Sequence, residues 1–121
     1  MARILIVDDS PTEIYVLKLM LIKEGYEIAT AKSGEEGIRV AKTQKPDLIL
    51  MDVVMPGMNG FQATRELSHA EETENIPIII VTTKDQQTDR VWATRQGAKD
   101  YLVKPVIEDE LVKSVKRYLS P

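Results

Sequence analysis

Short apolar runs of strand length alternate along the chain with longer amphipathic stretches. The runs are continuous rather than alternating in polarity, which is expected when both faces of a sheet are covered. The amphipathic stretches carry apolar residues at helical spacing, and capping residues precede several of them. This pattern predicts repeated strand–helix–strand units, and therefore a parallel sheet with helices on both of its faces.

The apolar runs and the caps place the expected elements. The predicted strands cover residues 3–7, 27–30, 48–51, 78–81 and 101–103. Helices are expected between Ser10 and Gly25, between Ser33 and Lys45, and over residues 60–67, 87–96 and 108–119. The polar stretch 68–75 is interpreted as a loop or a frayed helix end.

Local signals also indicate how the helices begin and which side they bury. Ser10 and Glu13 have the spacing of a capping box at the start of the first helix. In the fourth helix we expect Val91 to face the sheet, and we interpret Trp92 as a boundary packing residue rather than an exposed partner contact. Other positions expected to face the sheet are Ile14, Leu17, Leu21, Ile38, Ala41, Leu111, Val115 and Tyr118.

Five strand–helix units predict a doubly wound α/β fold of the flavodoxin-like type, with strand order 2-1-3-4-5. The 121 residues are enough for one domain, which we expect to span residues 1–121. Hydrophobic residues make up 43% of the chain and charged residues 29%, as in ordinary globular proteins. The sequence therefore predicts one globular α/β domain.

Composition and charge exclude several classes of function. The net charge is −3 and the sequence has no basic block, so it lacks the cluster of positive charge typical of nucleic-acid-binding proteins. The chain has no cysteine, and no apolar run approaches the length of a membrane span. The first residues, "MARILIV", lack a signal-peptide pattern. We therefore expect a cytoplasmic protein that neither inserts into a membrane nor binds nucleic acid.

Chemically active side chains follow four of the predicted strands. Asp8 and Asp9 follow the first strand, Asp52 the third, Thr82 the fourth and Lys104 the fifth. In the predicted strand order the first strand lies beside the third, so the three carboxylates should cluster, with the hydroxyl and the ammonium beside them. Ligands in open α/β sheets bind at this carboxyl edge. The sequence therefore predicts a functional site there.

Three carboxylates in one place repel each other unless a cation neutralises them or some are protonated. Oxygen ligands suit a hard cation, and Mg²⁺ takes one or two carboxylates together with waters and phosphate oxygens. The absence of cysteine and the single histidine, in a polar stretch, argue against zinc. We therefore expect Mg²⁺ as the cofactor.

With Mg²⁺ bound, one carboxylate can attack phosphorus and become an aspartyl phosphate. Asp52 fits the nucleophile because it is central and a turn-rich loop follows it. The Asp8 and Asp9 carboxylates suit metal binding, with the backbone carbonyl of Val54 as a further ligand. The Lys104 ammonium and the Thr82 hydroxyl, or nearby backbone N–H groups, would contact the transferred phosphoryl group.

Two other functions use similar residues. An aspartate-nucleophile phosphatase of the haloacid-dehalogenase type also needs a second acid two residues after the nucleophile. That position is Val54 here, which moves no proton. A scaffold that no longer accepts phosphate is the other alternative, and the intact acidic cluster argues against it.

The motifs resemble those of a known family. The acidic pair after "ILIV", the block "LMDVVMPGMNG", Thr82 after "IIIV" and the segment "GAKDYLVKP" stand in the order and spacing of the receiver domains of two-component response regulators. The resemblance covers nearly the whole chain and is nearest to single-domain, CheY-like members. It implies that Asp52 is the phosphoacceptor, that Thr82 and Tyr101 form a switch pair, and that the Lys104–Pro105 peptide bond is cis. For the other positions it implies the roles given above: Mg²⁺ binding by Asp8, Asp9 and the Val54 carbonyl, and a phosphoryl contact by Lys104.

The same resemblance implies the partners. The phosphodonor would be a phosphohistidine on a CheA-like sensor histidine kinase, and slow self-catalysed hydrolysis would follow, without enzymatic activity on other substrates. A downstream protein, such as a pilus or motor component, would bind the surface of the fourth helix, fifth strand and fifth helix of a monomer. The stretches "GFQATREL" and "IVTTKDQQTDRVWATRQGAKDYLVKPV" are similar to a receiver of type IV pilus twitching motility, while chemotaxis-type control stays open.

Overall fold

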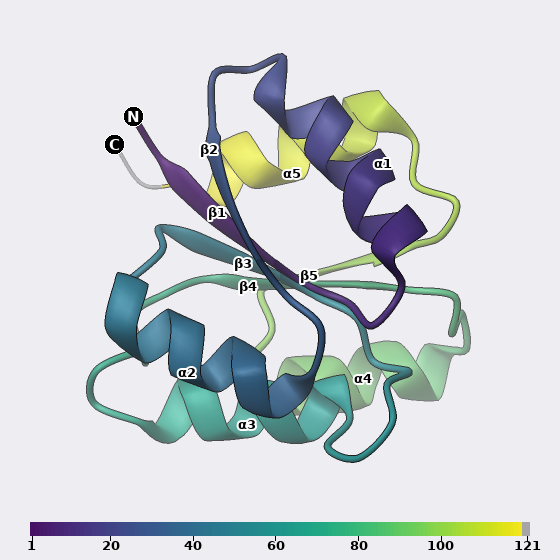
Figure 1. Cartoon of the computed structure of the whole chain (residues 1–121). Coiled ribbons are helices and arrows are strands. Elements are labelled where there is room, and N and C mark those ends of the chain that lie inside the picture. The colour runs from purple at the N-terminus through teal and green to yellow at the C-terminus, as the bar shows by residue number, and fades with distance from the viewer. Residues whose placement is uncertain (120–121) are drawn as a thin grey trace.

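Five parallel strands form one sheet in the order β2-β1-β3-β4-β5, as predicted (Figure 1). The computed structural model describes residues 1–119, so residues 120 and 121 of the predicted domain lie outside the described residues. The strands are β1 (Arg3–Val7), β2 (Glu27–Ala31), β3 (Leu48–Met51), β4 (Ile78–Thr82) and β5 (Asp100–Val103). The helices are α1 (Pro11–Ile22), α2 (Gly34–Gln44), α3 (Gly60–His69), α4 (Gln87–Gln96) and α5 (Glu108–Tyr118).

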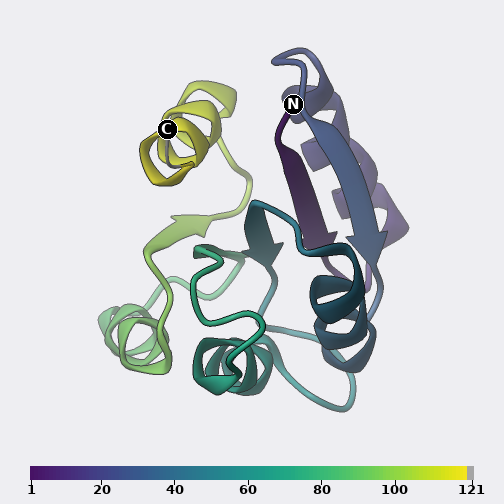
Figure 2. The same ribbon diagram turned by 90° about the vertical axis from the view of Figure 1, so that its left-hand side faces the viewer.

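Helices cover both faces of the sheet, with α1 and α5 on one face and α2, α3 and α4 on the other (Figure 1). Turned by 90°, the molecule shows β2 and β5 at opposite edges of the twisted sheet (Figure 2). Successive residues of β1 therefore enter different cores: Leu5 packs on the α2 side, and Ile4 and Ile6 pack on the α1 side. This explains why the strand sequences are continuously apolar.

The strands β1 and β3 and the helix α4 have the predicted bounds, and other boundaries differ from the prediction by one to three residues. The strands β2, β4 and β5 are each one residue longer, because residues such as Thr82 still pair with the neighbouring strand. Helix α3 continues to His69, so only residues 70–75 of the polar stretch lie outside it. Helix α1 ends at Ile22, and Gly25 adopts a left-handed conformation (φ 87°) in the turn that follows. Among residues 1–119, no helix is both long and apolar enough to cross a membrane.

The prediction for the buried side of α4 was wrong. Val91 is 43% exposed and Trp92 49% exposed, so neither packs in the core. Ala93 and Gln96 are the buried residues of this helix. The side chains that α4 buries are therefore a small one and an amide, while its bulky apolar residues Val91 and Trp92 stay exposed.

Candidate functional site

The carboxyl ends of β1 and β3 bring Asp8 and Asp52 together. The strands are neighbours, with Val7 paired to Met51, and each aspartate is the next residue in its chain segment. The Asp52 N–H donates to the Val7 carbonyl (2.9 Å), so the hydrogen-bonding ladder continues through the first residue of the site. The backbone of the sheet therefore sets the position of both side chains.

Asp8, Asp9 and Asp52 form the predicted acidic cluster. One carboxylate oxygen of each lies within 4.8 Å of those of the other two. The Asp8 side chain is almost fully buried, Asp52 is 6% exposed, and Asp9 is exposed at the mouth of the site. An all-oxygen set with an open side fits a hard divalent cation such as Mg²⁺, which keeps several of its waters.

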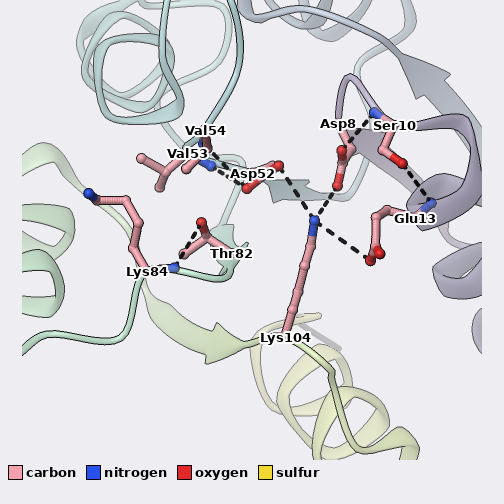
Figure 3. Close-up of polar contacts among 9 residues, drawn as sticks. All are labelled: Asp8, Ser10, Glu13, Asp52, Val53, Val54, Thr82, Lys84 and Lys104. Carbon is pink, nitrogen blue, oxygen red and sulfur yellow. Dashed lines mark hydrogen bonds and ion pairs between the residues drawn. The ribbon is translucent and has the colours of Figure 1, made fainter.

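Lys104 reaches into this cluster from the end of β5 (Figure 3). Its ammonium donates to Oδ2 of Asp8 (2.7 Å) and to Oδ2 of Asp52 (3.4 Å). Burial lowers the pKa of Lys104, but its hydrogen bond to the Asp8 carboxylate and the charge of Asp52 outweigh that effect, so the pKa lies above its ordinary value. The ammonium therefore stays charged. The Lys104–Pro105 peptide bond is cis, as the resemblance implies.

Glu13 is a member of the site that the sequence did not reveal. Its N–H donates to the Ser10 hydroxyl, but the second half of the predicted capping box is wrong, because the Ser10 N–H donates to Oδ1 of Asp8 (2.9 Å) and not to Glu13. Its carboxylate, however, lies 3.7 Å from the Lys104 ammonium. The capping spacing assigned the Glu13 carboxylate to the Ser10 N–H, so nothing in the sequence pointed to its contact with Lys104. Lys104 consequently faces three carboxylates, those of Asp8, Asp52 and Glu13.

The Asp52 carboxylate is held by the backbone that follows it. Its Oδ1 accepts from the N–H of Val53 (2.8 Å) and of Val54 (3.4 Å), while Oδ2 faces Lys104. Burial raises the pKa of Asp52, and the Lys104 charge lowers it by less, so the pKa lies above its ordinary value. Val54 itself is exposed. The role predicted for its carbonyl, as a metal ligand, stays a prediction.

The polar groups of Thr82 and Tyr101 bond to the same residue. The buried Thr82 hydroxyl accepts from the Lys84 N–H (3.5 Å), at the limit of a hydrogen bond. The Tyr101 hydroxyl donates to the Lys84 carbonyl (2.7 Å), and the Tyr101 side chain is only 8% exposed. The backbone of Lys84 therefore joins the two residues that the resemblance pairs as a switch. No sequence signal pointed to Lys84.

Gly60 closes the loop behind Asp52. Its N–H donates to the Val53 carbonyl (3.0 Å), and a Cβ at this position would collide with the backbone carbonyl of Asp52. Asn59 and Gln62 cap the helix start reciprocally, each side chain accepting from the other's N–H. The sequence suggested turn geometry for Gly60, and the structure adds a close approach to the backbone of the site.

The comparisons with known proteins agree with this geometry. A family model of the response regulator receiver domain matches residues 4–116. The chain is 59% identical over 120 residues to Protein PilH of Pseudomonas aeruginosa, and the match covers 99% of each chain.

Solved structures are similar over nearly the whole chain. The chemotaxis protein CheY4 of Vibrio cholerae is 33% identical with a TM-score of 0.92, covering 98% of this chain and 99% of that one. The receiver domain of a sensor histidine kinase from Pseudomonas aeruginosa PAO1, with a magnesium ion coordinated in its active site cleft, is 36% identical. Its TM-score is 0.90, and the match covers 98% of this chain and 97% of that one. The chain belongs to the family of receiver domains of two-component response regulators.

Proposed function

We propose that Asp52 accepts a phosphoryl group from a histidine kinase and that residues 1–121 act as one receiver domain. The observation that carries this proposal is the position of the Asp52 carboxylate, 3.4 Å from the Lys104 ammonium and within the acidic cluster. Receiver domains accept their phosphoryl group from such kinases. A carboxylate nucleophile beside a fixed cation suits this transfer.

In the proposed transfer, an ionised Asp52 oxygen forms a bond to the phosphorus of a phosphohistidine. The bond from phosphorus to the histidine nitrogen breaks, and the electron pair leaves with the imidazole, which takes up a proton. Lys104 holds a phosphoryl oxygen, and the Thr82 hydroxyl turns towards another. Water later attacks the same phosphorus, the bond from phosphorus to the Asp52 oxygen breaks, and inorganic phosphate leaves as the Asp52 carboxylate is restored. The chain therefore acts only on its own phosphoryl group.

The donors suited to Mg²⁺ are the carboxylates of Asp8, Asp9 and Asp52 and the carbonyl of Val54. Bound there, Mg²⁺ would neutralise the acidic cluster and the charge of the phosphoryl oxygens. The buried Asp8 is oriented for this role, since its Oδ1 accepts from the Ser10 N–H (2.9 Å). Asp9 is exposed and has room to turn towards a cation.

The proposed output is a change of the surface formed by α4, β5 and α5. Phosphorylation adds a charge of about −1.5 to −2 and strong acceptor oxygens beside Thr82. Moving the Thr82 hydroxyl breaks its contact with Lys84, the residue that also holds Tyr101. Residues 88–92 and 108–113 would then meet a protein partner differently.

We propose that this switch acts in type IV pilus twitching motility, because the chain is 59% identical to PilH. The partners would be a CheA-like sensor kinase and a component of the pilus machinery, acting on a monomer. Control of chemotaxis is the second candidate, because CheY4 has the same architecture. In a strain that lacks this protein, the wild-type chain should restore twitching and Asp52→Asn should not. Restored swimming control in its place would favour chemotaxis.

Labelling by acetyl phosphate tests the chemistry directly. With Mg²⁺ present, intact-mass measurement should detect one labile phosphoryl group on the wild-type chain and none on Asp52→Ala. Asp109→Ala, which removes an exposed aspartate of α5, is the matched control and should be labelled normally. Labelling that persists in Asp52→Ala would overturn the assignment. Rapid turnover of a small phosphomonoester would instead favour the phosphatase alternative.

A further inference from the structure

Tyr101 is held at both ends of its side chain. The hydroxyl donates to the Lys84 carbonyl (2.7 Å), and the Arg90 guanidinium lies over the ring, 5.0 Å from its centroid. Arg90 is exposed, whereas Tyr101 is buried. The guanidinium therefore covers a ring face that lies near the surface between α4 and β5. A planar cation at this distance attracts the ring electrostatically.

The first turn of α4 positions Arg90 for this contact. The Asp89 carboxylate accepts from the Gln86 N–H (3.2 Å) and lies 3.7 Å from the Lys84 ammonium. The Arg90 N–H donates to the Gln86 carbonyl (3.3 Å), within the same turn. Lys84 thus contacts Asp89 with its side chain and Tyr101 with its carbonyl. The start of α4 and the Tyr101 side chain form one connected unit.

We propose that Arg90 is a positioning residue that holds Tyr101 in its buried orientation. This inference rests on the proposed function, which makes Tyr101 part of the switch. For Tyr101 to turn to an exposed orientation, its ring must lose the contact with the Arg90 guanidinium and its hydroxyl must lose the hydrogen bond to the Lys84 carbonyl. The Lys84 N–H also donates to the Thr82 hydroxyl, which lies beside Asp52 in the proposed switch. Stabilising the buried ring therefore also favours the present position of the Lys84 backbone, which links the site to the surface of α4. Arg90 thereby sets the balance between the two orientations.

The test observes Tyr101 itself, without phosphorylation. Nuclear magnetic resonance of protein labelled on its tyrosine rings reports the ratio of buried to exposed Tyr101. In Arg90→Gln this ratio should fall about two- to fivefold, the effect of one exposed cation–π contact. Arg90→Lys should restore part of the ratio. Arg95→Ala, which removes an exposed arginine from the last turn of the same helix, should leave it unchanged.

An unchanged ratio in Arg90→Gln would overturn the proposal, as would an equal fall in Arg95→Ala. Emission from the single tryptophan, Trp92, and thermal unfolding verify that each variant keeps its fold. The acetyl phosphate experiment fails or succeeds separately. A shift of Tyr101 in Arg90→Gln without labelling of Asp52 would keep the positioning role and reject the proposed function. Normal labelling of Asp52, together with an unchanged Tyr101 ratio in Arg90→Gln, would keep the proposed function and reject the positioning role.

Discussion

The ammonium of Lys104 lies 2.7 Å from Oδ2 of Asp8, although Lys104 comes 96 positions after Asp8 in the chain. Lys104 follows β5 and Asp8 follows β1, and two strands, β3 and β4, stand between these in the sheet. The lysine side chain therefore extends across the carboxyl edge of the sheet. Asp52, which follows β3, lies close to its path and takes the second contact (3.4 Å).

Removing the Lys104 charge should destabilise the protein. In Lys104→Met, the buried Asp8 and Asp52 lose their cation, and we expect the free energy of unfolding to fall by about 3 kcal/mol without Mg²⁺. Urea denaturation at neutral pH measures this change. Lys23→Met breaks an exposed ion pair with Glu108 and should cost less than about 1 kcal/mol. Equal losses in the two variants would contradict a buried, paired Lys104.

Magnesium should stabilise the folded chain through the acidic cluster. A ligand at about 100 times its Kd adds about 2.7 kcal/mol to the free energy of unfolding. Asp9→Asn should reduce this gain at a given Mg²⁺ concentration, because Asp9 supplies one of the clustered oxygens. Thermal unfolding with increasing Mg²⁺ measures the effect, and Asp109→Asn, an exposed acid of α5, is the control. If both variants gain as much as the wild type, Asp9 is not a ligand.

Gly60→Ala should damage both the fold and the site. The new Cβ would collide with the Asp52 carbonyl, so the backbone must shift, at a cost of about 1–3 kcal/mol. Because the shift moves Asp52, Mg²⁺ affinity measured by titration calorimetry should fall as well. Gly25→Asn is the control, since Gly25 has open space around it and asparagine tolerates its left-handed backbone. Unchanged affinity in Gly60→Ala would show that Asp52 does not depend on this close approach.

Tyr101 should release its proton at unusually high pH. Burial and the charge of Asp89 raise the pKa of Tyr101 from its ordinary value of 10.0 to about 12, although the Arg90 charge lowers it. The folded chain thus keeps a proton that the unfolded chain loses. The protonated Tyr101 hydroxyl contributes its full share to the free energy of unfolding below about pH 10, and this contribution is lost as the pH rises to about 12.

Ultraviolet titration of the tyrosinate signal measures this pKa. One of the four tyrosines should ionise near pH 12, and this step should be missing in Tyr101→Phe. The variant should also lose stability less steeply across the same interval. A titration curve that is the same near pH 12 in both proteins would contradict the buried position of the Tyr101 hydroxyl.

Local sequence patterns were sufficient for the elements and for most of the site. The continuous apolar runs predicted strands covered on both faces, and β1 and β3 have the predicted bounds. Parallel strands end at one edge of a sheet, so the order of the strands was enough to bring Asp8, Asp52 and Lys104 together. This inference needed only the backbone, since each residue directly follows its strand.

Contacts between side chains from different elements depended on the tertiary structure. The spacing of residues in α4 does not fix how this helix is rotated about its axis. The apolar pattern of α4 is weak, so the exposure of Val91 and Trp92 could not be predicted from it. The contact of Arg90 with Tyr101 depends on that same rotation. The capping spacing assigned the Glu13 side chain a local bond that does not form, and its approach to Lys104 depends on how α1 is placed relative to the end of β5. The sequence by itself determined which residues end the strands, because hydrophobic period and caps are local. Only packing decided where their side chains and those of the helices meet, because such contacts depend on how whole elements are oriented.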